Sequence, residues 1–221
     1  MFSIKKVLIL SLLLFGFLNG YSQDLVKDYK EFYDQITDLE AYSIAGSFQL
    51  FNNGNLESEQ KVKIDKFKKN YFLEFGPNEI VYSEKMVLTL NHPFKSIMMS
   101  ERDSDFDLLN SNDQFKALKE QIDSGFVKYS YIKGDEPYYK IEPTKGAFKS
   151  MNLFFKDGFL VKIVSHYNFD GAGFNRSVLK LNYKTDVIFN KKEFSLDRYA
   201  YKEKGEYRMK DPYKDYEITL N

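Results

Sequence analysis

The chain contains no cysteine and no tryptophan, and only two of its 221 residues are histidine. Without cysteine there is no disulfide framework, no thiolate metal site and no thiol that could accept a lipid, which excludes a small disulfide-stapled module. His92 and His166 lie far apart in the sequence and do not form the HxH or HxxxH spacing of a histidine metal site. We therefore expect no metal ion and no cofactor.

Motifs for covalent or nucleotide chemistry are also missing. There is no GxSxG elbow, glycine-rich phosphate loop or dinucleotide fingerprint. Residues 103–107 begin like an EF-hand calcium loop, but Leu108 and Gln114 occupy the places where that loop needs glycine and glutamate. No spacing singles out two of the 32 acidic residues as an acid–base pair. We expect a protein that is not an enzyme, with a carboxylate enzyme as a weaker alternative.

The chain has no excess of basic charge, since 32 lysines and arginines balance 32 acidic residues. This balance excludes nucleic acid as a partner. Lys5 and Lys6, the apolar stretch 7–18 and the small residues Gly20 and Ser22 are typical of a cleavable secretory signal. The stretch is shorter than the roughly 20 residues of a spanning helix, although a membrane anchor is the alternative. We expect a periplasmic protein cleaved near Ser22–Gln23.

Aromatic residues are abundant, with 21 Phe and 17 Tyr, and they lie in short segments of strand-like alternation. The connections between these segments are short and carry turn signals such as Asn53-Gly54 and Asp157-Gly158, which favours antiparallel pairing. Strands are expected at residues 41–51, 61–65, 70–75, 79–82, 86–90, 94–99, 126–132, 138–142, 150–155, 159–167 and 176–183, with a short last strand at 194–199.

Two segments have helical periodicity instead. Residues 24–39 carry apolar side chains at intervals of three and four, and residues 104–122 read as two short helices that end at Gly125. The predicted fold is therefore mainly β: an open antiparallel half-barrel, or curved sheet, with an N-terminal helix and a two-helix lid insert. We predict a signal peptide at 1–22, one half-barrel domain at 23–200, and a C-terminal tail at 201–221 that packs on the domain or extends from it.

This order of elements, together with three local segments, resembles the LolA/LolB family of outer-membrane lipoprotein carriers. The first segment is residues 62–75, with paired strands around a basic turn, and the second is residues 77–83, with a proline–acid step into a strand. The third is residues 141–143 followed by 151–163, with a late hairpin at Lys156-Asp157-Gly158. The resemblance implies a periplasmic lipid-binding chaperone for lipoprotein transport and outer membrane biogenesis. Its partners would be lipoprotein acyl chains or another lipid, an inner-membrane release complex and an outer-membrane acceptor, and it is expected to be a monomer.

Strand alternation supplies candidate residues for the wall of the apolar cavity. They are Phe48, Leu50, Val62, Ile64, Leu73, Phe75, Leu88, Leu90, Ile97, Met99, Leu153 and Phe155. The lid would face them with Phe106, Leu109, Phe115, Leu118 and Ile122. The resemblance places Lys66 where family members often have an arginine that latches the lid, and lysine keeps the charge but lacks the planar fork. The same apolar residues would equally fill a solid β core.

A second hypothesis is a non-enzymatic interaction module of a periplasmic envelope assembly. Residues 199–216 are rich in tyrosine and charge, a composition that is frequent in protein interfaces. Such a module would bind protein through its sheet and tail, and would bind no lipid.

Overall fold

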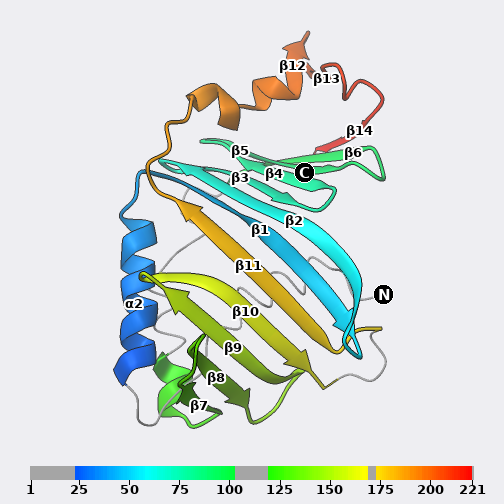
Figure 1. Ribbon diagram of the computed structural model, residues 1–221. Coiled ribbons are helices and arrows are strands. Elements are labelled where there is room, and N and C mark those ends of the chain that lie inside the picture. The colour runs from blue at the N-terminus through cyan, green and yellow to red at the C-terminus, as the bar shows by residue number, and fades with distance from the viewer. Residues whose placement is uncertain (1–22, 103–118, 169–172, 221) are drawn as a thin grey trace. The chain divides into compact units, whose positions relative to one another are not determined.

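The computed structural model describes residues 23–102, 119–168 and 173–220. The chain is mainly β, with an N-terminal helix and a twelve-stranded sheet in the order β14-β6-β5-β4-β3-β2-β1-β11-β10-β9-β8-β7 (Figure 1). The sheet is open, with β14 and β7 as its two edges, and it is antiparallel except where β14 pairs parallel to β6. The prediction of an open antiparallel sheet with an N-terminal helix is confirmed. Of the predicted lid insert, residues 119–123 are helical and 103–118 lie outside the described residues.

The elements follow the expected alternation closely. They are α2 (Gln23–Thr37), β1 (Ala41–Asn52), β2 (Asn55–Phe67), β3 (Asn70–Phe75), β4 (Asn78–Tyr82), β5 (Met86–Asn91), β6 (Ser96–Glu101), β7 (Val127–Ile132), β8 (Tyr138–Pro143), β9 (Phe148–Lys156), β10 (Phe159–Tyr167), β11 (Arg176–Lys184) and β14 (Glu217–Leu220). Two compact units divide this sheet between them. Of the described residues, unit 1 comprises 23–38, 48–59, 119–168 and 173–181, and unit 2 comprises 39–47, 60–102 and 182–220.

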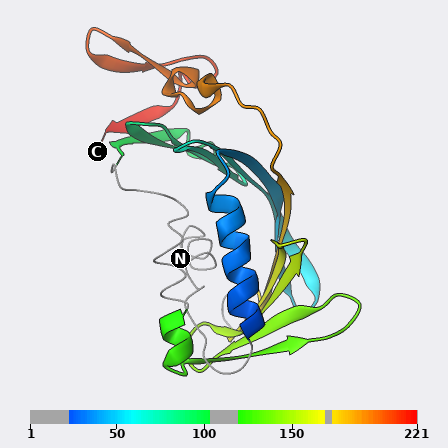
Figure 2. The same cartoon turned by 90° about the vertical axis from the view of Figure 1, so that its left-hand side faces the viewer.

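In unit 1, helix α2 packs against one face of the strands. One side of the helix carries a stripe of apolar side chains that are buried in this contact, and Figure 2 shows the helix beside the strands. Its Phe32 ring lies 6.3 Å from the Phe155 ring of β9, and the Tyr139 hydroxyl of β8 donates a 2.7 Å hydrogen bond to Asp28. The buried residues of the stripe are Leu25, Tyr29, Tyr33 and Ile36. Burial of each such side chain stabilises the unit by about 1.5–3 kcal/mol.

Two hairpins of unit 1 turn through positive φ, as their Asn-Gly and Asp-Gly steps predict. Gly54 has φ +90° in the β1–β2 turn and Gly158 has φ +79° in the β9–β10 turn. A left-handed backbone costs a residue with a side chain about 1–2 kcal/mol, and glycine avoids this cost.

Replacing either glycine with alanine is expected to lower the free energy of unfolding by about 1–2 kcal/mol. A Cβ atom at Gly158 would also lie 2.4 Å from Nε2 of Gln35, whereas at Gly54 it would meet nothing within 4 Å. Because the Gln35 amide is the end of a flexible side chain, we expect similar losses in urea unfolding of the two variants. A much larger loss for Gly158→Ala, relieved by Gln35→Ala, would show that Gln35 cannot move.

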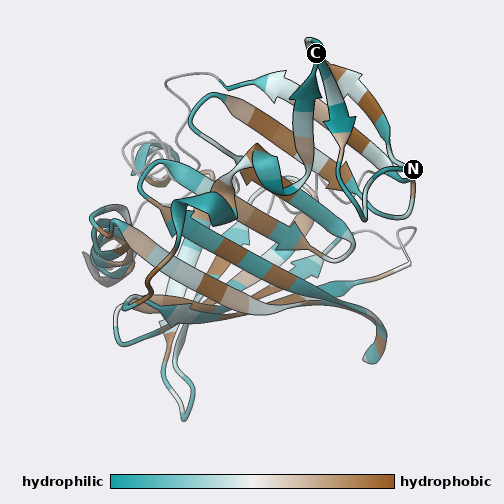
Figure 3. Cartoon of the chain, turned by 90° about the horizontal axis from the view of Figure 1, so that it is seen from above, coloured by the Kyte–Doolittle hydropathy of each residue, from teal (hydrophilic) through white to brown (hydrophobic). Residues whose placement is uncertain are grey.

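Unit 2 has a closed core on one face of its sheet, which we call the covered face. Cross-strand pairs place Val81 opposite Leu88, Leu88 opposite Met99, and Leu90 opposite Ile97, and all five side chains are fully buried. Brown apolar positions alternate with teal polar ones along the strands, the period-two pattern of a sheet (Figure 3). What closes this face is the chain's own C-terminal segment, residues 182–220, whose Tyr199 is fully buried in the same cluster.

The C-terminal segment is also tied down by polar contacts. The Tyr199 hydroxyl donates a 2.8 Å hydrogen bond to Glu79 of β4, and the other Glu79 oxygen lies 3.0 Å from Nε2 of His92. Nδ1 of His92 lies 2.8 Å from the Tyr216 hydroxyl. Burial, reinforced by the Glu79 carboxylate, raises the pKa of Tyr199 well above its usual range, so the phenol stays a neutral donor. Strand β14 then pairs parallel to β6, with Ile218 opposite Ile97.

The prediction of a strand at 194–199 is wrong, because two short 3-10 helices occupy this region. Helix η1 (Lys191–Phe194) begins at a capping box. The Asn190 side-chain oxygen accepts a hydrogen bond from the Lys192 N–H, and the Glu193 carboxylate accepts one from the Asn190 N–H. Helix η2 (Leu196–Arg198) is capped by Ser195, whose hydroxyl accepts from the Asp197 N–H. These local side-chain bonds outweigh the short apolar pattern. The hairpin of β12 (Ala200–Glu203) and β13 (Glu206–Met209) follows.

Candidate functional site

The opposite face of the unit 2 sheet carries a second apolar row, which we call the open face. Ile64 of β2 is opposite Leu73 of β3, Leu73 is opposite Ile80 of β4, and the row continues through Thr89 to Met98 on β6. The first four side chains of this row are half-buried, and Met98 is 42% exposed. Phe75 and Val87, also half-buried, extend the apolar surface to either side.

The difference between the two faces of unit 2 is what marks a candidate site. On the covered face Leu88, Leu90, Ile97 and Met99 are each 0% exposed, so no room is left for a ligand. On the open face an apolar row keeps contact with solvent. An apolar patch that the chain leaves partly exposed is the usual mark of a binding surface, because its removal from water lowers the free energy.

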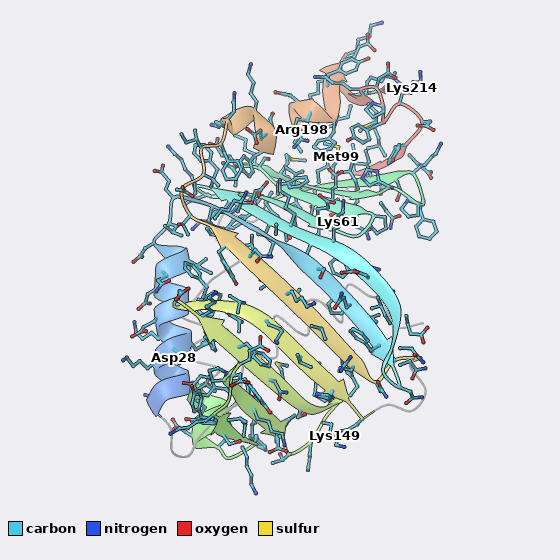
Figure 4. The ribbon with its side chains drawn as sticks, viewed as in Figure 1. Asp28, Lys61, Met99, Lys149, Arg198 and Lys214 are labelled. Atoms are coloured by element: carbon cyan, nitrogen blue, oxygen red, sulfur yellow. The ribbon has the colours of Figure 1, made fainter. Side chains whose placement is uncertain are left out.

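The structure separates the predicted cavity residues of unit 2 into two groups. Val62, Ile64, Leu73 and Phe75 share the open face, since Val62 is opposite Phe75 and Ile64 is opposite Leu73. The other four lie on the covered face against the C-terminal segment, and Figure 4 shows labelled Met99 below Arg198 of η2. These four are Leu88, Leu90, Ile97 and Met99. A ligand could reach that second group only if the C-terminal segment left the sheet.

The remaining predicted cavity residues belong to unit 1. Leu153, fully buried, and Phe155, half-buried, lie on the strand face that α2 covers, and Phe48 is buried while Leu50 is half-buried. Of the predicted lid residues, Ile122 is buried. The other four, Phe106, Leu109, Phe115 and Leu118, lie outside the described residues. Contact of any of these side chains with a ligand stays a prediction.

Lys66, the predicted lid latch, is buried on the open-face side of β2. It is opposite Tyr71 of β3, and its Nζ atom lies 5.6 Å from the centre of the Tyr42 ring. A lysine over an aromatic face gains cation–π stabilisation, which is one way of keeping a charge in a buried position. The latch itself stays a prediction, because its partner segment 103–118 is outside the described residues.

The cavity residues predicted from the sequence do not include Ile80, Tyr82, Val87 and Met98, which lie on the open face. The register of each hairpin could have identified these residues. Directly opposed residues of an antiparallel pair have side chains on the same face of the sheet. Ile80 is opposite Leu73 and therefore shares its face, whereas Val81 lies on the other face. The short turns gave no reason to choose between these registers, since β4 and β5 are apolar on both faces.

Other kinds of site receive no support from the described part of the chain. Within it, no group of three or more His, Asp or Glu residues lies close enough to hold a metal ion. None of the helices described is long and apolar enough to cross a membrane.

Comparison with known proteins gives likeness at the level of structure. No family model matches the chain, and no curated protein matches it significantly. The crystal structure of an uncharacterized conserved protein from Thermus thermophilus is similar over 90% of this chain and 100% of its own, at 14% identity and a TM-score of 0.50. Two matches have lower TM-scores. A LolA superfamily protein from Nitrosomonas europaea is similar over 81% of this chain and 100% of its own, at 11% identity and a TM-score of 0.34. The Pseudomonas aeruginosa MucA/MucB complex is similar over 78% of this chain and 60% of the matched chain, at 9% identity and a TM-score of 0.40. The likeness to the Thermus thermophilus protein extends to the fold and to nothing finer.

Proposed function

We propose that the protein is a non-enzymatic periplasmic carrier that shields lipoprotein acyl chains, or another lipid, against the open face of unit 2. The observation that carries the proposal is the partly exposed row from Ile64 to Met98 on the open face, while the opposite, covered face is already closed. Each CH₂ group of an acyl chain costs about 0.8 kcal/mol in water, so an apolar sheet face of several strands offsets most of this cost.

Two features of the sequence support the same function. The expected signal at residues 1–22 would bring the chain to the periplasm, where acyl chains must cross water between two membranes. The segments that resemble LolA/LolB carriers include residues 62–75 and 77–83, which lie in β2, β3 and β4, three of the strands that form the open face. In this function a release complex at the inner membrane would load the carrier and an outer-membrane acceptor would empty it.

The carrier function is tested by binding of a fluorescent fatty-acyl probe to the mature protein. Leu73→Asp and Met98→Asp place a carboxylate on the open face, and each is expected to weaken binding by about tenfold or more, because the acyl chain would have to desolvate a charge. Met98 is already 42% exposed, so its substitution is expected to leave the fold intact. Ile188→Asp is the matched control, since Ile188 is 99% exposed and lies outside the strands.

Native mass spectrometry of protein purified without detergent would complement the probe. A bound lipid or lipopeptide mass supports the carrier and identifies the cargo. An apo mass with no probe uptake, or equal loss of binding in Ile188→Asp, would contradict the proposal.

The second candidate function, a protein-binding envelope module, is favoured by one observation. The C-terminal segment presents Tyr201 at 45% and Leu220 at 61% exposure, on elements that are accessible for contact with a partner. Tyrosine-rich surfaces of this kind are enriched in interfaces. Capture of an envelope protein that is lost in Tyr201→Ala, while Met98→Asp captures it normally and no acyl probe binds, would favour this module over the carrier.

A further inference from the structure

Unit 1 contains a hollow of about 380 Å³ that the carrier function does not use. It lies where the start of β9, the end of β10, the start of β11 and the β1–β2 turn meet, and Figure 4 marks Lys149 in this part of unit 1. Apart from Gly54, each lining residue carries a polar or charged group, and no carboxylate is among the described residues that line the hollow. Its lining residues are Asn53, Gly54, Lys149, His166, Tyr167, Asn175 and Arg176.

The backbone brings three nitrogen-bearing side chains to this hollow. His166 of β10 and Arg176 of β11 are direct cross-strand partners. The β9–β10 register shifts between His166 and Tyr167, so that Lys149 is an extra residue of β9 at this irregularity, beside Ser150, the partner of His166. An extra residue in a strand re-aims its neighbours and is a common device for placing a functional side chain. Three groups that can be cationic therefore line one hollow, although like charges on opposed strand positions destabilise a sheet.

These three groups have no counter-ion among the described residues. Arg176 makes no ion pair there, and its buried Nε atom has no hydrogen-bond partner. The guanidinium carbon of Arg176 lies 4.2 Å from the centre of the Phe51 ring, a cation–π contact that holds the side chain. Arg176 lines the hollow, and a guanidinium without a carboxylate partner leaves its charge to be neutralised by a bound anion.

We propose that this hollow, with Arg176, Lys149 and His166 at its centre, is a binding site for a phosphate group. The planar fork of Arg176 matches two phosphate oxygens, and Lys149 contributes a point charge to a third. Asn53 and Asn175, joined by a 3.1 Å hydrogen bond between their amides, line the hollow as further polar groups. A phosphate of about −1.5 to −2 charge would neutralise the cluster.

His166 makes the site responsive to pH. Burial lowers the pKa of His166, and the nearby cations of Arg176, Lys149 and Lys140 lower it further, so the free site holds a neutral imidazole at neutral pH. A bound anion favours the imidazolium and raises this pKa. Affinity should therefore increase as the pH falls through the pKa of His166 in the free protein.

The proposal is tested by calorimetric titration of the mature protein with inorganic phosphate at low ionic strength. We expect saturable binding of one phosphate, weakened about tenfold or more in Arg176→Gln and in Lys149→Gln, since charged hydrogen bonds are the strong ones. Lys180→Gln, an exposed change of equal charge on the same strand β11, is the matched control and should bind normally. Absence of saturable binding, or equal weakening in Lys180→Gln, overturns the proposal. Lys149 is exposed, so its variant keeps the test valid even if Arg176→Gln is poorly folded.

A pH series with sulfate separates the His166 contribution from the titration of phosphate itself. Sulfate affinity should rise as the pH is lowered in the wild type and should be flat in His166→Gln. A pH dependence that persists in His166→Gln removes His166 from the site.

Two sources of phosphate are distinguished by vesicles. Co-sedimentation with phosphatidylcholine vesicles that contain phosphatidate, but not with pure phosphatidylcholine, and its loss in Arg176→Gln, would assign a lipid headgroup. Binding of free phosphate with no recruitment to either vesicle would assign a soluble phosphate compound. These measurements do not involve the open face of unit 2. A negative result for phosphate binding therefore does not contradict the carrier proposal, and a negative result for acyl binding does not contradict the phosphate site.

Discussion

Truncation of Tyr199 to alanine is expected to lower the free energy of unfolding of unit 2 by about 3–5 kcal/mol. Tyr199 is fully buried at the centre of the covered face, in one cluster with Val81, Leu88 and Met99. Removal of the ring leaves a cavity among side chains that are close-packed and can collapse only in part. The loss would be measured by urea unfolding followed by circular dichroism and tyrosine fluorescence.

Two further variants separate the contributions of the Tyr199 side chain. Tyr199→Phe keeps the ring and removes the hydrogen bond to Glu79, for which we expect a loss of about 1–3 kcal/mol, since one acceptor loses its partner while His92 still contacts the other carboxylate oxygen. Tyr201→Ala, two residues along at 45% exposure, is expected to stay within about 0.5 kcal/mol of wild type. A loss of the same small size for Tyr199→Ala would mean that the C-terminal segment does not close the core.

Much of the fold of unit 1 could be predicted because its local signals agree. The Asn53-Gly54 and Asp157-Gly158 steps adopt positive φ and so define two hairpins. The apolar residues of 24–39 recur at intervals of three and four, and a helix is the structure that brings them to one side, where they can be buried. Each of these features is decided within a few residues of sequence.

The C-terminal segment could not be predicted in the same way, because its structure depends on contacts distant in sequence. Tyr199 is buried only because β4, β5 and β6 present an apolar face to it, and β14 is a strand only because β6 offers an edge. Residues 194–199 were predicted as a strand from a short apolar pattern, whereas the caps at Asn190 and Ser195 decide for 3-10 turns. Short apolar runs do not distinguish these outcomes.

The candidate site was predicted in part for a related reason. Alternation along a strand places residues that are two apart on the same face of the sheet. Val62 and Ile64 do share one face, and Leu88 and Leu90 share the other. Alternation does not indicate which of the two apolar faces is covered by another part of the chain. In unit 2 that choice depends on the C-terminal segment, which closes the face of Leu90 and leaves the face of Leu73 open.

Replacing Leu90 with aspartate is expected to lower the free energy of unfolding of unit 2 by about 4 kcal/mol or more at neutral pH. Leu90 is 0% exposed between its cross-strand partners Ile97 and Glu79, so the new carboxylate would be cut off from water and would face a second carboxylate. A buried charge without a partner raises its own pKa, because burial disfavours the ionised form. The folded state of the variant therefore binds a proton more readily than the unfolded state, and its deficit relative to wild type should shrink as the pH is lowered.

The same substitution on the two faces of one sheet distinguishes a core from a ligand surface. Leu90→Met, which conserves volume, is expected to cost less than about 1.5 kcal/mol and controls for the loss of leucine itself. Leu73→Asp, on the half-buried open face, should retain cooperative unfolding while losing the acyl probe, whereas Leu90→Asp should lose the fold of unit 2 first. A folded Leu90→Asp that has lost the acyl probe would contradict this assignment, since it would mean that the C-terminal segment leaves the sheet and that the covered face is the one that receives lipid.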